Sequence, residues 1–292
     1  MIIDKTKDLP ILPNNKPHVS YSEVKNWKEC AWRHKLAYID GITSDEPSQY
    51  LSYGSAIHDG IENFLLSGQM DIEKTLSDIK SEWKKHEFDS DVFIKKQADI
   101  RKNNGWKPKP HLYLDVWLEY AKNSLNEIPT FLEETFGEYE VVSAEEQLYE
   151  HVPEVGAYFK GFIDALIKTK DKKGNEIYWV IDWKTAGDKG WYASKRRDIL
   201  TWAQIALYKH FWRNKNNIDI KSVRCGFVLL KRGAPKGKIC ELVKVSVGEK
   251  AEAKCTSILR SMVLSMKRGI YLKNRNSCLF CDYKGTVHCP GS

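Results

Sequence analysis

Asp182 and Lys184 are an acid and an amine two positions apart in residues 180–185, a segment that is otherwise β-branched or aromatic. A strand turns alternate side chains to opposite faces, so this pair would share one face, roughly 7 Å apart along the backbone. Ile181 and Trp183 would then point into a core. Charged groups beside an apolar strand are costly to bury without a partner. Acids and lysines at this spacing also occur by chance on solvated strands, so the neighbouring segments decide between the two interpretations.

A second carboxylate lies on the segment that precedes this strand. Residues 161–167 alternate apolar and polar side chains, and residues 170–175 have the composition of a turn. If Lys170 pairs with Glu176 across that turn, the same register places Asp164 opposite Asp182. Directly opposed residues share a face, with side chains about 5 Å apart. The sequence therefore predicts two carboxylates and one lysine on the same face of a hairpin.

A divalent metal ion would explain this predicted crowding. Like charges opposite each other destabilise a sheet unless a cation lies between them, and carboxylate oxygens suit a hard divalent cation. Such a metal would lower the pKa of a bound water and neutralise charge on a phosphodiester. Lys184 could orient or deprotonate that water, or stabilise the transition state. Asp164, Asp182 and Lys184 together predict a metal-dependent hydrolytic site.

These residues resemble the signature of PD-(D/E)XK nucleases, in which an aspartate is followed by a strand and then by D-x-K. The wider pattern resembles the RecB-like branch of that superfamily. Four segments match the motifs of this branch in the same order: Gly54-x-x-x-His58, Gly161-Phe162-Ile163-Asp164, Ile181-Asp182-Trp183-Lys184-Thr185 and Gln204-x-x-x-Tyr208. The resemblance covers about residues 20–290, and the combination is far more specific than any one motif.

The resemblance implies a set of metal ligands. Asp164, Asp182 and His58 would hold Mg²⁺ or Mn²⁺ together with the backbone carbonyl of Trp183, and Lys184 would handle the nucleophilic water. A lone histidine beside an apolar helix stripe is more often a structural residue. The place of His58 in the ordered set of motifs is what favours a ligand.

The resemblance also implies three accessory catalytic residues. Gln204 and Tyr208 lie one helical turn apart and would position the substrate or the catalytic lysine, although a polar helix flank would look the same. Members of the branch also carry a glutamate on the strand before the first aspartate. Glu145 and Glu146 both fit this position and the sequence does not separate them; we select Glu146 as the prediction.

The cysteines form a second pattern. The chain has seven, an odd number that argues against a disulfide framework. Cys278 and Cys281 form a C-x-x-C motif, and Cys289 follows after seven further residues, which suggests a metal site. Cys30 lies far upstream. Three others have the surroundings of small core residues: Cys225, Cys240 and Cys255.

The four clustered or upstream cysteines resemble those of an iron–sulfur subgroup that includes AddB and the CRISPR-adaptation nucleases. There, one N-terminal and three C-terminal cysteines hold a [4Fe-4S] cluster, which implies that Cys30, Cys278, Cys281 and Cys289 are its ligands. The gap before Cys289 is longer than is usual in the subgroup. A four-cysteine Zn²⁺ site, with His288 as a substitute ligand, and a frayed tail with free thiols remain alternatives.

The candidate catalytic residues Asp164, Asp182 and Lys184 would need a β-sheet to hold them in position. Hydrophobic periodicity predicts strands near 138–150, 158–169, 176–184, 222–231 and 239–247. It predicts helices over 20–36, from Gly54, over 71–101, 111–128, 198–212 and 248–268. We expect an α/β (α+β) fold whose central mixed β-sheet is flanked by helices, and the resemblance implies a restriction-endonuclease-like core. The expected organisation is one nuclease domain, 1–292, comprising an arm (1–19), a helical portion (20–135), a nuclease core (136–247) and a C-terminal helix with the cysteine cluster (248–292).

Composition agrees with a nucleic-acid partner. The chain of 292 residues has a formal net charge of +7, which suits a polyanion. Basic residues within 102–109 and 195–197 are candidates for phosphate contacts. No apolar run reaches membrane-spanning length, and the first residues lack a signal-peptide layout. We expect a cytoplasmic protein of a bacterial or phage-infected cell.

The resulting functional prediction is a Mg²⁺- or Mn²⁺-dependent deoxyribonuclease. By analogy with the RecB-like branch it would be an exonuclease acting on DNA ends or single strands in recombination, repair or phage DNA processing. The chain has no Walker A loop, so a helicase, recombinase or integrase partner would be a separate protein. The alternative is a non-catalytic DNA-binding or scaffold subunit that keeps the nuclease fold. Polarity, strand preference and oligomeric state stay open.

Overall fold

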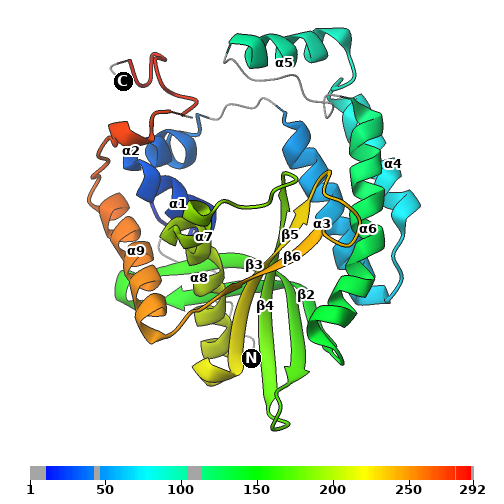
Figure 1. The fold of residues 1–292 in the computed structure, drawn as a ribbon. Helices are drawn as coiled ribbons and strands as arrows, with labels where there is room; N and C mark the ends of the chain where they lie inside the picture. The colour runs from blue at the N-terminus through cyan, green and yellow to red at the C-terminus, as the bar shows by residue number, and fades with distance from the viewer. Residues whose placement is uncertain (1–10, 43–46, 104–112, 280, 291–292) are drawn as a thin grey trace, which may run out of the picture.

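The computed structural model describes residues 11–42, 47–103, 113–279 and 281–290, and within them a mixed sheet of six strands forms the centre (Figure 1). The strands are β1 (His18–Ser20), β2 (Glu140–Val152), β3 (Ala157–Lys170), β4 (Glu176–Ala186), β5 (Val223–Lys231) and β6 (Cys240–Val245). Their order is β1-β3-β4-β5-β6, and β2 pairs with β3 outside this order. β1 runs parallel to β3 and β4 runs parallel to β5, while the other pairs are antiparallel. The predicted mixed sheet flanked by helices is confirmed.

The hairpin register also agrees with the prediction. Lys170 pairs with Glu176, and the ladder between β3 and β4 continues without a shift to Ala165 and Ile181. The next position on each strand carries the two aspartates. The turn between the strands is closed by Asp171, whose side chain accepts hydrogen bonds from the backbone of the following turn residues. A short polar turn therefore sets the register of the strands that carry the site.

Helices cover the two faces of the sheet. In chain order they are α1 (Tyr21–Glu29), α2 (Ala31–His34), α3 (Gln49–Ser67), α4 (Ile72–Lys85), α5 (Asp91–Asn103), α6 (Leu114–Phe136), α7 (Ala193–Arg197), α8 (Ile199–Lys215) and α9 (Glu249–Lys267). Shorter turns are a π-helix (Lys35–Ile39) and the 3₁₀ segments Pro153–Val155, Ile220–Ser222 and Arg275–Ser277. None of the helices within the described ranges is long and apolar enough to span a bilayer.

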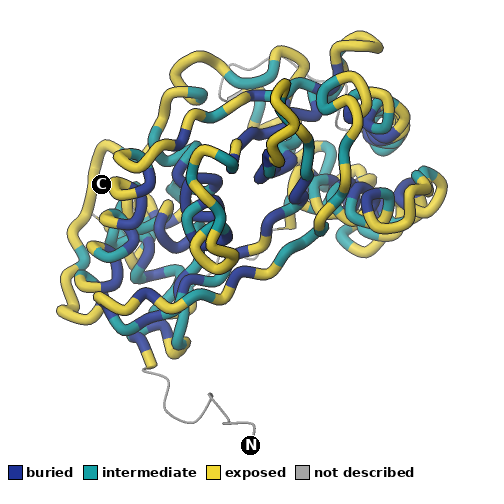
Figure 2. The backbone as a smooth tube through the Cα atoms, turned by 90° about the horizontal axis from the view of Figure 1, so that it is seen from below, coloured by how far each residue is buried: buried dark blue, intermediate teal, exposed yellow. Residues whose placement is uncertain are grey.

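Two hydrophobic cores hold these layers together. One lies between the sheet and helices α1, α8 and α9, and contains Phe159, Phe211 and Leu259. The other lies between the sheet and helices α3, α4 and α6, and contains Ile57 and Trp183. Figure 1 shows the two groups of helices on opposite sides of the sheet, and Figure 2 shows buried stretches along the strands and the inner sides of the helices. The sheet is thus anchored by apolar burial on both faces.

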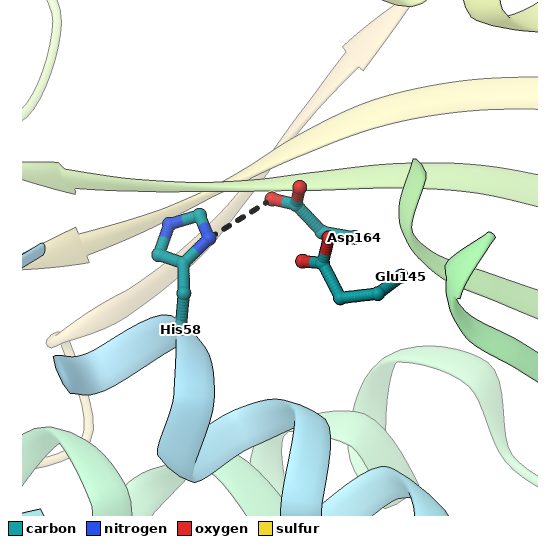
Figure 3. Close-up of side chains that lie close together, drawn as sticks. All are labelled: His58, Glu145 and Asp164. Atoms are coloured by element: carbon teal, nitrogen blue, oxygen red, sulfur yellow. Dashed lines mark ion pairs between the residues drawn. The ribbon is translucent and has the colours of Figure 1, made fainter. Parts of the chain in front are cut away.

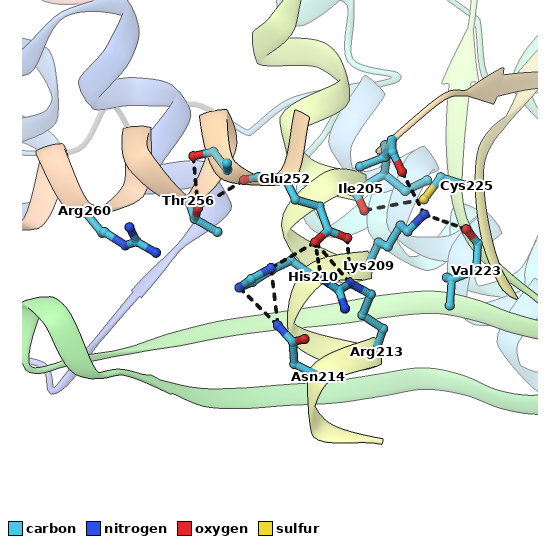
Figure 4. Close-up of polar contacts among 12 residues, drawn as sticks. Ile205, Lys209, His210, Arg213, Asn214, Val223, Cys225, Glu252, Thr256 and Arg260 are labelled. Atoms are coloured by element: carbon cyan, nitrogen blue, oxygen red, sulfur yellow. Dashed lines mark hydrogen bonds and ion pairs between the residues drawn. The ribbon is translucent and has the colours of Figure 1, made fainter. Parts of the chain in front are cut away.

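A buried polar network joins α8 to α9 (Figure 4). Glu252 of α9 is 3% exposed and accepts hydrogen bonds from Arg213, with a shortest distance of 2.6 Å, while its Oε2 lies 3.2 Å from Nδ1 of His210. The ammonium of Lys209 donates to the carbonyls of Val223 and Val247 at 2.6 and 2.8 Å. Because these buried charges are hydrogen-bonded, they fix the position of α8, which carries the Gln204 and Tyr208 motif.

The N-terminal segment differs in part from the prediction. Ser20 and Glu23 form the expected capping box at the start of α1. The helix does not run on to Leu36, because Cys30 has an extended backbone with φ of −162° and separates α1 from α2. The residues expected as an extended arm include β1, in which His18 pairs with Tyr158 of β3. Residues 18–20 are therefore part of the sheet.

Two further helix boundaries also differ from the prediction. The charged segment 71–101 is two helices, because Glu87 has a left-handed backbone with φ of 51° and Phe88 turns back to pack on Trp83, with ring centroids 5.3 Å apart. Helix α6 continues through Pro129, where the prediction ended it. Ile128 and Leu132 are both fully buried on either side of this proline, and their burial offsets a proline cost of about 3 kcal/mol.

Helix α3 begins at Gln49, five residues before the predicted start at Gly54. Gln49 is 5% exposed and Tyr53 is fully buried against Trp117 of α6, with ring centroids 4.9 Å apart. This tertiary packing extends the helix N-terminally. As a result His58 lies in the middle of a long, rigid helix rather than in its first turn.

Candidate active site

The two aspartates lie where β3 and β4 stop pairing. Ala165 and Ile181 form the last pair of the ladder. At the next position the carboxylate of Asp164 accepts a hydrogen bond from the backbone N–H of Trp183 at 2.7 Å. A side-chain oxygen therefore takes the place of the strand carbonyl. This bond fixes the Asp164 carboxylate in the gap between the strands and next to the D-x-K triplet.

Asp182 and Lys184 form a close ion pair on β4. The ammonium of Lys184 lies 2.6 Å from Oδ2 of Asp182, which is fully buried. Oδ1 of Asp182 has no hydrogen-bond partner within the described part of the chain. Burial alone lowers the pKa of Lys184, but the charges of Asp182 and Asp164 outweigh it, so the net pKa is raised and the amine stays protonated. A buried carboxylate oxygen without a donor is a position that a cation would satisfy.

His58 and Glu145 complete this group from α3 and β2 (Figure 3). Ligand atoms of His58, Glu145 and Asp164 all lie within 4.8 Å of one another, the one such group of three or more among the described residues. Nδ1 of His58 is 3.4 Å from Oδ2 of Asp164. One imidazole nitrogen and carboxylate oxygens from two strands form a donor set that suits Mn²⁺ or Mg²⁺.

The protonation of these groups reflects their crowding. Burial raises the pKa of Asp164 well above its ordinary value, and the nearby charge of Asp182 raises it further. Burial also raises the pKa of Glu145, with added repulsion from Glu62 and Asp182. Burial lowers the pKa of His58, against the attraction of Asp182, so its imidazole is neutral near pH 7. A neutral imidazole is the form that binds a metal, and a bound cation would remove the repulsion between the carboxylates.

The glutamate that lies beside His58 and Asp164 is Glu145, whereas the prediction selected Glu146. The side chain of Glu146 extends to Lys215 of α8, with an Nζ to Oε1 distance of 3.2 Å. Glu145 has a left-handed backbone with φ of 50°, which turns its side chain toward His58 and Asp164. Simple alternation along the strand assigns neighbouring residues to opposite faces but does not reveal this local twist.

Gln204 and Tyr208 meet on the face of α8 that packs against the sheet. Nε2 of Gln204 donates to the Tyr208 hydroxyl at 3.2 Å. The Tyr208 ring packs closely on Gly161, where an added Cβ would lie 2.6 Å from its Cε1. Burial raises the pKa of Tyr208, and the charge of Asp182 adds to the shift. Tyr208 therefore lies close enough to Asp182 for its pKa to respond to that charge. The absence of a side chain at Gly161 leaves space for the Tyr208 ring.

Basic side chains lie near Lys184. Burial lowers the pKa of Lys195 in α7, and the charges of Lys25 and Lys184 lower it further, which places three ammonium groups within electrostatic reach. Lys195 lies over the ring of Trp191 at 4.7 Å from its centroid. Arg196 is instead paired with Glu241 at 2.7 Å. Lys25 was not among the residues predicted from sequence; it lies on α1, which packs against α8, and its charge acts on Lys195.

The second predicted basic segment lies mostly beyond the part of the chain that the structure describes. Lys102 lies in α5, whereas residues 104–109 lie outside the described residues. None of the acidic groups of the site comes from α5. Residues 102–109 therefore stay a prediction from sequence.

The four predicted cluster cysteines line one small cavity. Cys30, Cys278, Cys281 and Cys289 surround a space of about 20 Å³ between the N-terminal helices and the C-terminal segment. All four are free thiols. The backbone N–H of Asn274 donates to Sγ of Cys30 at 3.4 Å. No three sulfur atoms among the described cysteines lie within 4.8 Å of one another, so they converge without forming a tight cluster.

The C-terminal segment is attached to the N-terminal helices by hydrogen bonds. Asn274 and Ser277 both donate to the carbonyl of Glu29, at 2.8 and 2.7 Å. The indole of Trp32 donates to the carbonyl of His288 at 3.1 Å. These bonds bring Cys30 beside the three C-terminal cysteines, although the two segments are far apart in the chain. The described part of this segment is therefore docked rather than frayed, although its thiols are free.

Comparison with known proteins agrees with this geometry. The profile of the PD-(D/E)XK nuclease superfamily matches residues 18–286. A crystal structure designated "Putative exonuclease" from Eubacterium rectale superposes with a TM-score of 0.51 at 14% identity, over 92% of this chain and 87% of that chain. The structure of SSO0001 gives a TM-score of 0.33 at 12% identity over 90% of this chain and 93% of that chain, too low for an argument about fold. No curated protein sequence matches.

The family match spans the helical region, the sheet and most of the cysteine-rich segment. It includes every strand and helix that contributes a residue to the site: α3, β2, β3, β4 and α8. The positions at which β3 and β4 part carry the aspartates and the lysine that define the signature. The chain belongs to the PD-(D/E)XK nuclease superfamily.

Proposed function

We propose that this protein is a Mg²⁺- or Mn²⁺-dependent deoxyribonuclease of the RecB-like branch that hydrolyses phosphodiester bonds at DNA ends or in single strands. The observation that carries the proposal is the contact of Lys184 with Asp182 beside Asp164 at the point where the two strands part. Nuclease chemistry needs a cation site and a charged donor next to each other. Here both lie within one gap of the sheet.

Five groups would hold the metal ion: the side chains of Asp164, Asp182, His58 and Glu145, and the Trp183 carbonyl. The bound ion would lower the pKa of its water and offset charge on the phosphate. The unsatisfied Oδ1 of Asp182 and the raised pKa of the Asp164 carboxyl both fit a site made for a cation.

Lys184 would act as a charged donor rather than as a general base. Its pKa is raised, because the two aspartates outweigh the effect of burial, so its amine carries a proton at neutral pH. A protonated amine can orient a water or a phosphate oxygen and stabilise the charge that develops in the transition state. Gln204 and Tyr208, which are linked by a hydrogen bond, would position the substrate or Lys184.

Exonuclease activity is the preferred mode. It is supported by the RecB-like motifs and by the shared fold with the Eubacterium rectale protein of that designation. DNA recombination, repair or phage DNA processing would be the setting, with any helicase, recombinase or integrase as a separate partner. The non-catalytic scaffold alternative is disfavoured because Asp164, Asp182 and Lys184 are all present and meet at the gap between the strands.

The cysteine site is proposed to hold a [4Fe-4S] cluster. Four thiols that line one cavity supply the full donor set of such a cluster, and a backbone N–H to Cys30 is the kind of bond that stabilises cluster thiolates. A Zn²⁺ ion with Zn–S bonds of about 2.3 Å would hold its sulfurs about 3.8 Å apart. No three of the described cysteine sulfurs lie within 4.8 Å of one another, so the cluster is preferred over zinc on the resemblance to the iron–sulfur subgroup alone.

Linear and circular DNA distinguish the proposed modes. Purified protein would be incubated with end-labelled linear single strands, linear duplex and covalently closed circles, each with Mg²⁺, Mn²⁺ or EDTA. An exonuclease degrades the linear substrates, spares the circles and is inactive in EDTA. Degradation of the circles would contradict the exonuclease mode, and no cleavage of any substrate with either metal would favour the scaffold alternative.

A further inference from the structure

The first half of β3 exposes an aromatic and basic face that the catalytic site does not use. Directly paired residues of neighbouring strands share a face. Phe162 pairs with Gln147, Lys160 with Tyr149 and Ser20, and Tyr158 with His151 and His18. We call the set the aromatic face: His18, Ser20, Gln147, Tyr149, His151, Tyr158, Lys160 and Phe162.

Four of the five rings of this face are in contact with one another. Tyr149 and Tyr158 are stacked, with centroids 4.9 Å apart and planes 20° apart. His18 packs edge-on against Tyr149 at 5.6 Å, and His151 lies 5.1 Å from Tyr158. The ammonium of one lysine, Lys160, lies 5.6 Å from the centroid of the Phe162 ring. Four rings, those of His18, Tyr149, His151 and Tyr158, therefore form one contacting group, and Lys160 links this group to the separate ring of Phe162.

These rings are not part of a hydrophobic core. The intervening residues Leu148 and Phe159 point the other way and are fully buried under α8 and α9. Phe162 is 40% exposed and Tyr149 is 36% exposed. Large apolar side chains exposed together on one strand face are a common mark of a binding surface.

The charge of the face matches a polyanion. Its eight residues include one lysine, two histidines and no carboxylate. Burial and the charge of Lys160 lower the pKa of His18, so the positive charge of the face at neutral pH comes from Lys160. Proteins that bind single-stranded nucleic acid combine basic groups for phosphates with aromatic rings on which bases stack. Protein interfaces are also rich in aromatic rings, but they match charges of both signs across the contact, whereas this face carries only basic charge. The chemistry of this face therefore favours unpaired nucleotides.

The aromatic face lies on the same strand, β3, as the predicted metal ligand Asp164. Phe162 precedes Asp164 by two residues on β3, which is roughly 7 Å along a strand, and Tyr158 and Lys160 continue the same row away from the site. We propose that the aromatic face binds unpaired DNA nucleotides adjacent to the scissile phosphate and so selects single-stranded DNA. This proposal rests on the proposed function, because it assigns the substrate class of the same site.

Binding without cleavage tests the proposal. Fluorescence anisotropy of fluorescein-labelled dT20 would be measured in EDTA, which prevents metal-dependent hydrolysis. Phe162→Ala and Tyr149→Ala should each weaken binding about fivefold or more, since one base–ring stack contributes at least ~1 kcal/mol. Phe162→Trp should bind as the wild type, whereas Phe162→Leu, which keeps bulk but not the ring, should bind like the alanine variant.

A second pair of variants tests whether the position of the Lys160 charge matters, or only the net charge of the protein. Lys160→Gln should weaken dT20 binding more than Lys250→Gln, which removes an equal charge from the first turn of α9. Equal losses would mean that only net charge matters and would count against the face. Crosslinking of 5-bromouracil-substituted DNA should label the peptide that contains Phe162, and labelling elsewhere would contradict the proposal. Thermal unfolding of every variant would be compared with the wild type to identify misfolding.

The outcomes separate this proposal from the nuclease assignment. If the protein cuts DNA but the Phe162 and Tyr149 variants bind dT20 like the wild type, the proposed DNA binding by the aromatic face is wrong and the proposed nuclease activity is supported. If dT20 binding is weaker in the variants although no cleavage occurs with either metal, the DNA binding by the aromatic face is supported and the proposed nuclease activity is wrong. Absence of dT20 binding by the wild type would contradict the proposal that this face binds DNA. Variants that change only the mass measured by sedimentation, and not dT20 binding, would also contradict it.

Discussion

Glu145 lies across the β2–β3 ladder from Asp164, between the pairs Ala144–Ala165 and Glu146–Ile163. Its backbone is left-handed, with φ of 50°. This conformation costs a residue other than glycine of order 1 kcal/mol, and such residues persist where the surrounding structure holds them in place. The strain turns one carboxylate toward His58 and the next toward α8, and so decides which glutamate belongs to the site.

Glu145→Gln and Glu146→Gln form a matched pair of variants. Glu145→Gln should weaken Mn²⁺ binding and lower the rate of cleavage by about tenfold or more, because it removes one charged metal ligand. Glu146→Gln loses only a partly exposed pair with Lys215 and should stay within about threefold of the wild type. Isothermal titration with Mn²⁺ and initial cleavage rates provide the measurements. The reverse order of effects would assign the site to Glu146 instead.

The part of the site on the β3–β4 hairpin could be predicted from sequence. A short polar turn fixed the pairing of Lys170 with Glu176, and strand alternation then placed Asp164 beside Asp182. No comparable rule exists for Glu145. Its orientation depends on a local backbone twist that becomes visible only when β2, β3 and α3 pack together.

Gly161→Ala should disturb the Gln204–Tyr208 pair. An added Cβ would lie 2.6 Å from Cε1 of Tyr208, so the ring must move. We expect a loss of about 1–3 kcal/mol in the free energy of unfolding, typical of overpacking, together with slower cleavage. Gly187→Ala is the control, because a Cβ added there would have no atom within 4 Å. Urea unfolding that is unchanged in Gly161→Ala would contradict the close contact.

Glu252 gives the protein a stability that depends on pH. Burial alone raises the pKa of Glu252, but hydrogen bonds from His210 and Arg213 outweigh it and lower the pKa below its ordinary value of 4.5. A lowered pKa in the folded state means that this stabilisation is present above about pH 4.5 and is lost as the pH falls through the folded-state pKa. Glu252→Gln should therefore destabilise the protein by ~3 kcal/mol at pH 7 and by less at acidic pH.

The matched control for this effect is Glu249→Gln, an exposed acid in the first turn of the same helix. It should change the free energy of unfolding by no more than about 0.5 kcal/mol at either pH. Thermal or urea unfolding at pH 7 and at acidic pH gives both values. A Glu252→Gln effect that is constant with pH would mean that its carboxylate charge is not the source of the stability.

The cysteine site predicts a specific spectroscopic loss. Cys281→Ser should lower the iron and sulfide content of anaerobically purified protein, reduce absorbance at about 400 nm and lower the melting temperature. Cys255→Ala is the control, because Cys255 is buried in α9 away from the cavity. A colourless wild type that contains one zinc per chain would contradict the cluster and support the zinc alternative.

Other parts of the fold were not predictable because tertiary packing overrides local signals. Proline is a helix breaker in sequence reasoning, yet α6 passes through Pro129 because Ile128 and Leu132 are both buried. The break at Cys30 had no glycine or proline to mark it. At this break the carbonyl of Glu29 accepts hydrogen bonds from Asn274 and Ser277 of the C-terminal segment, contacts between residues far apart in the chain that local sequence does not show.

We propose Asp182 and Lys184 as the catalytic pair of a metal-dependent nuclease. The most direct test of this proposal is the cleavage rate of end-labelled single-stranded DNA in Mn²⁺ by wild type, Lys184→Ala and the control Lys189→Ala, an exposed lysine five residues further on. We predict a loss of about 10²–10⁴-fold in Lys184→Ala alone, with the Mn²⁺-induced rise in melting temperature retained. Cleavage by Lys184→Ala at the wild-type rate would contradict the account.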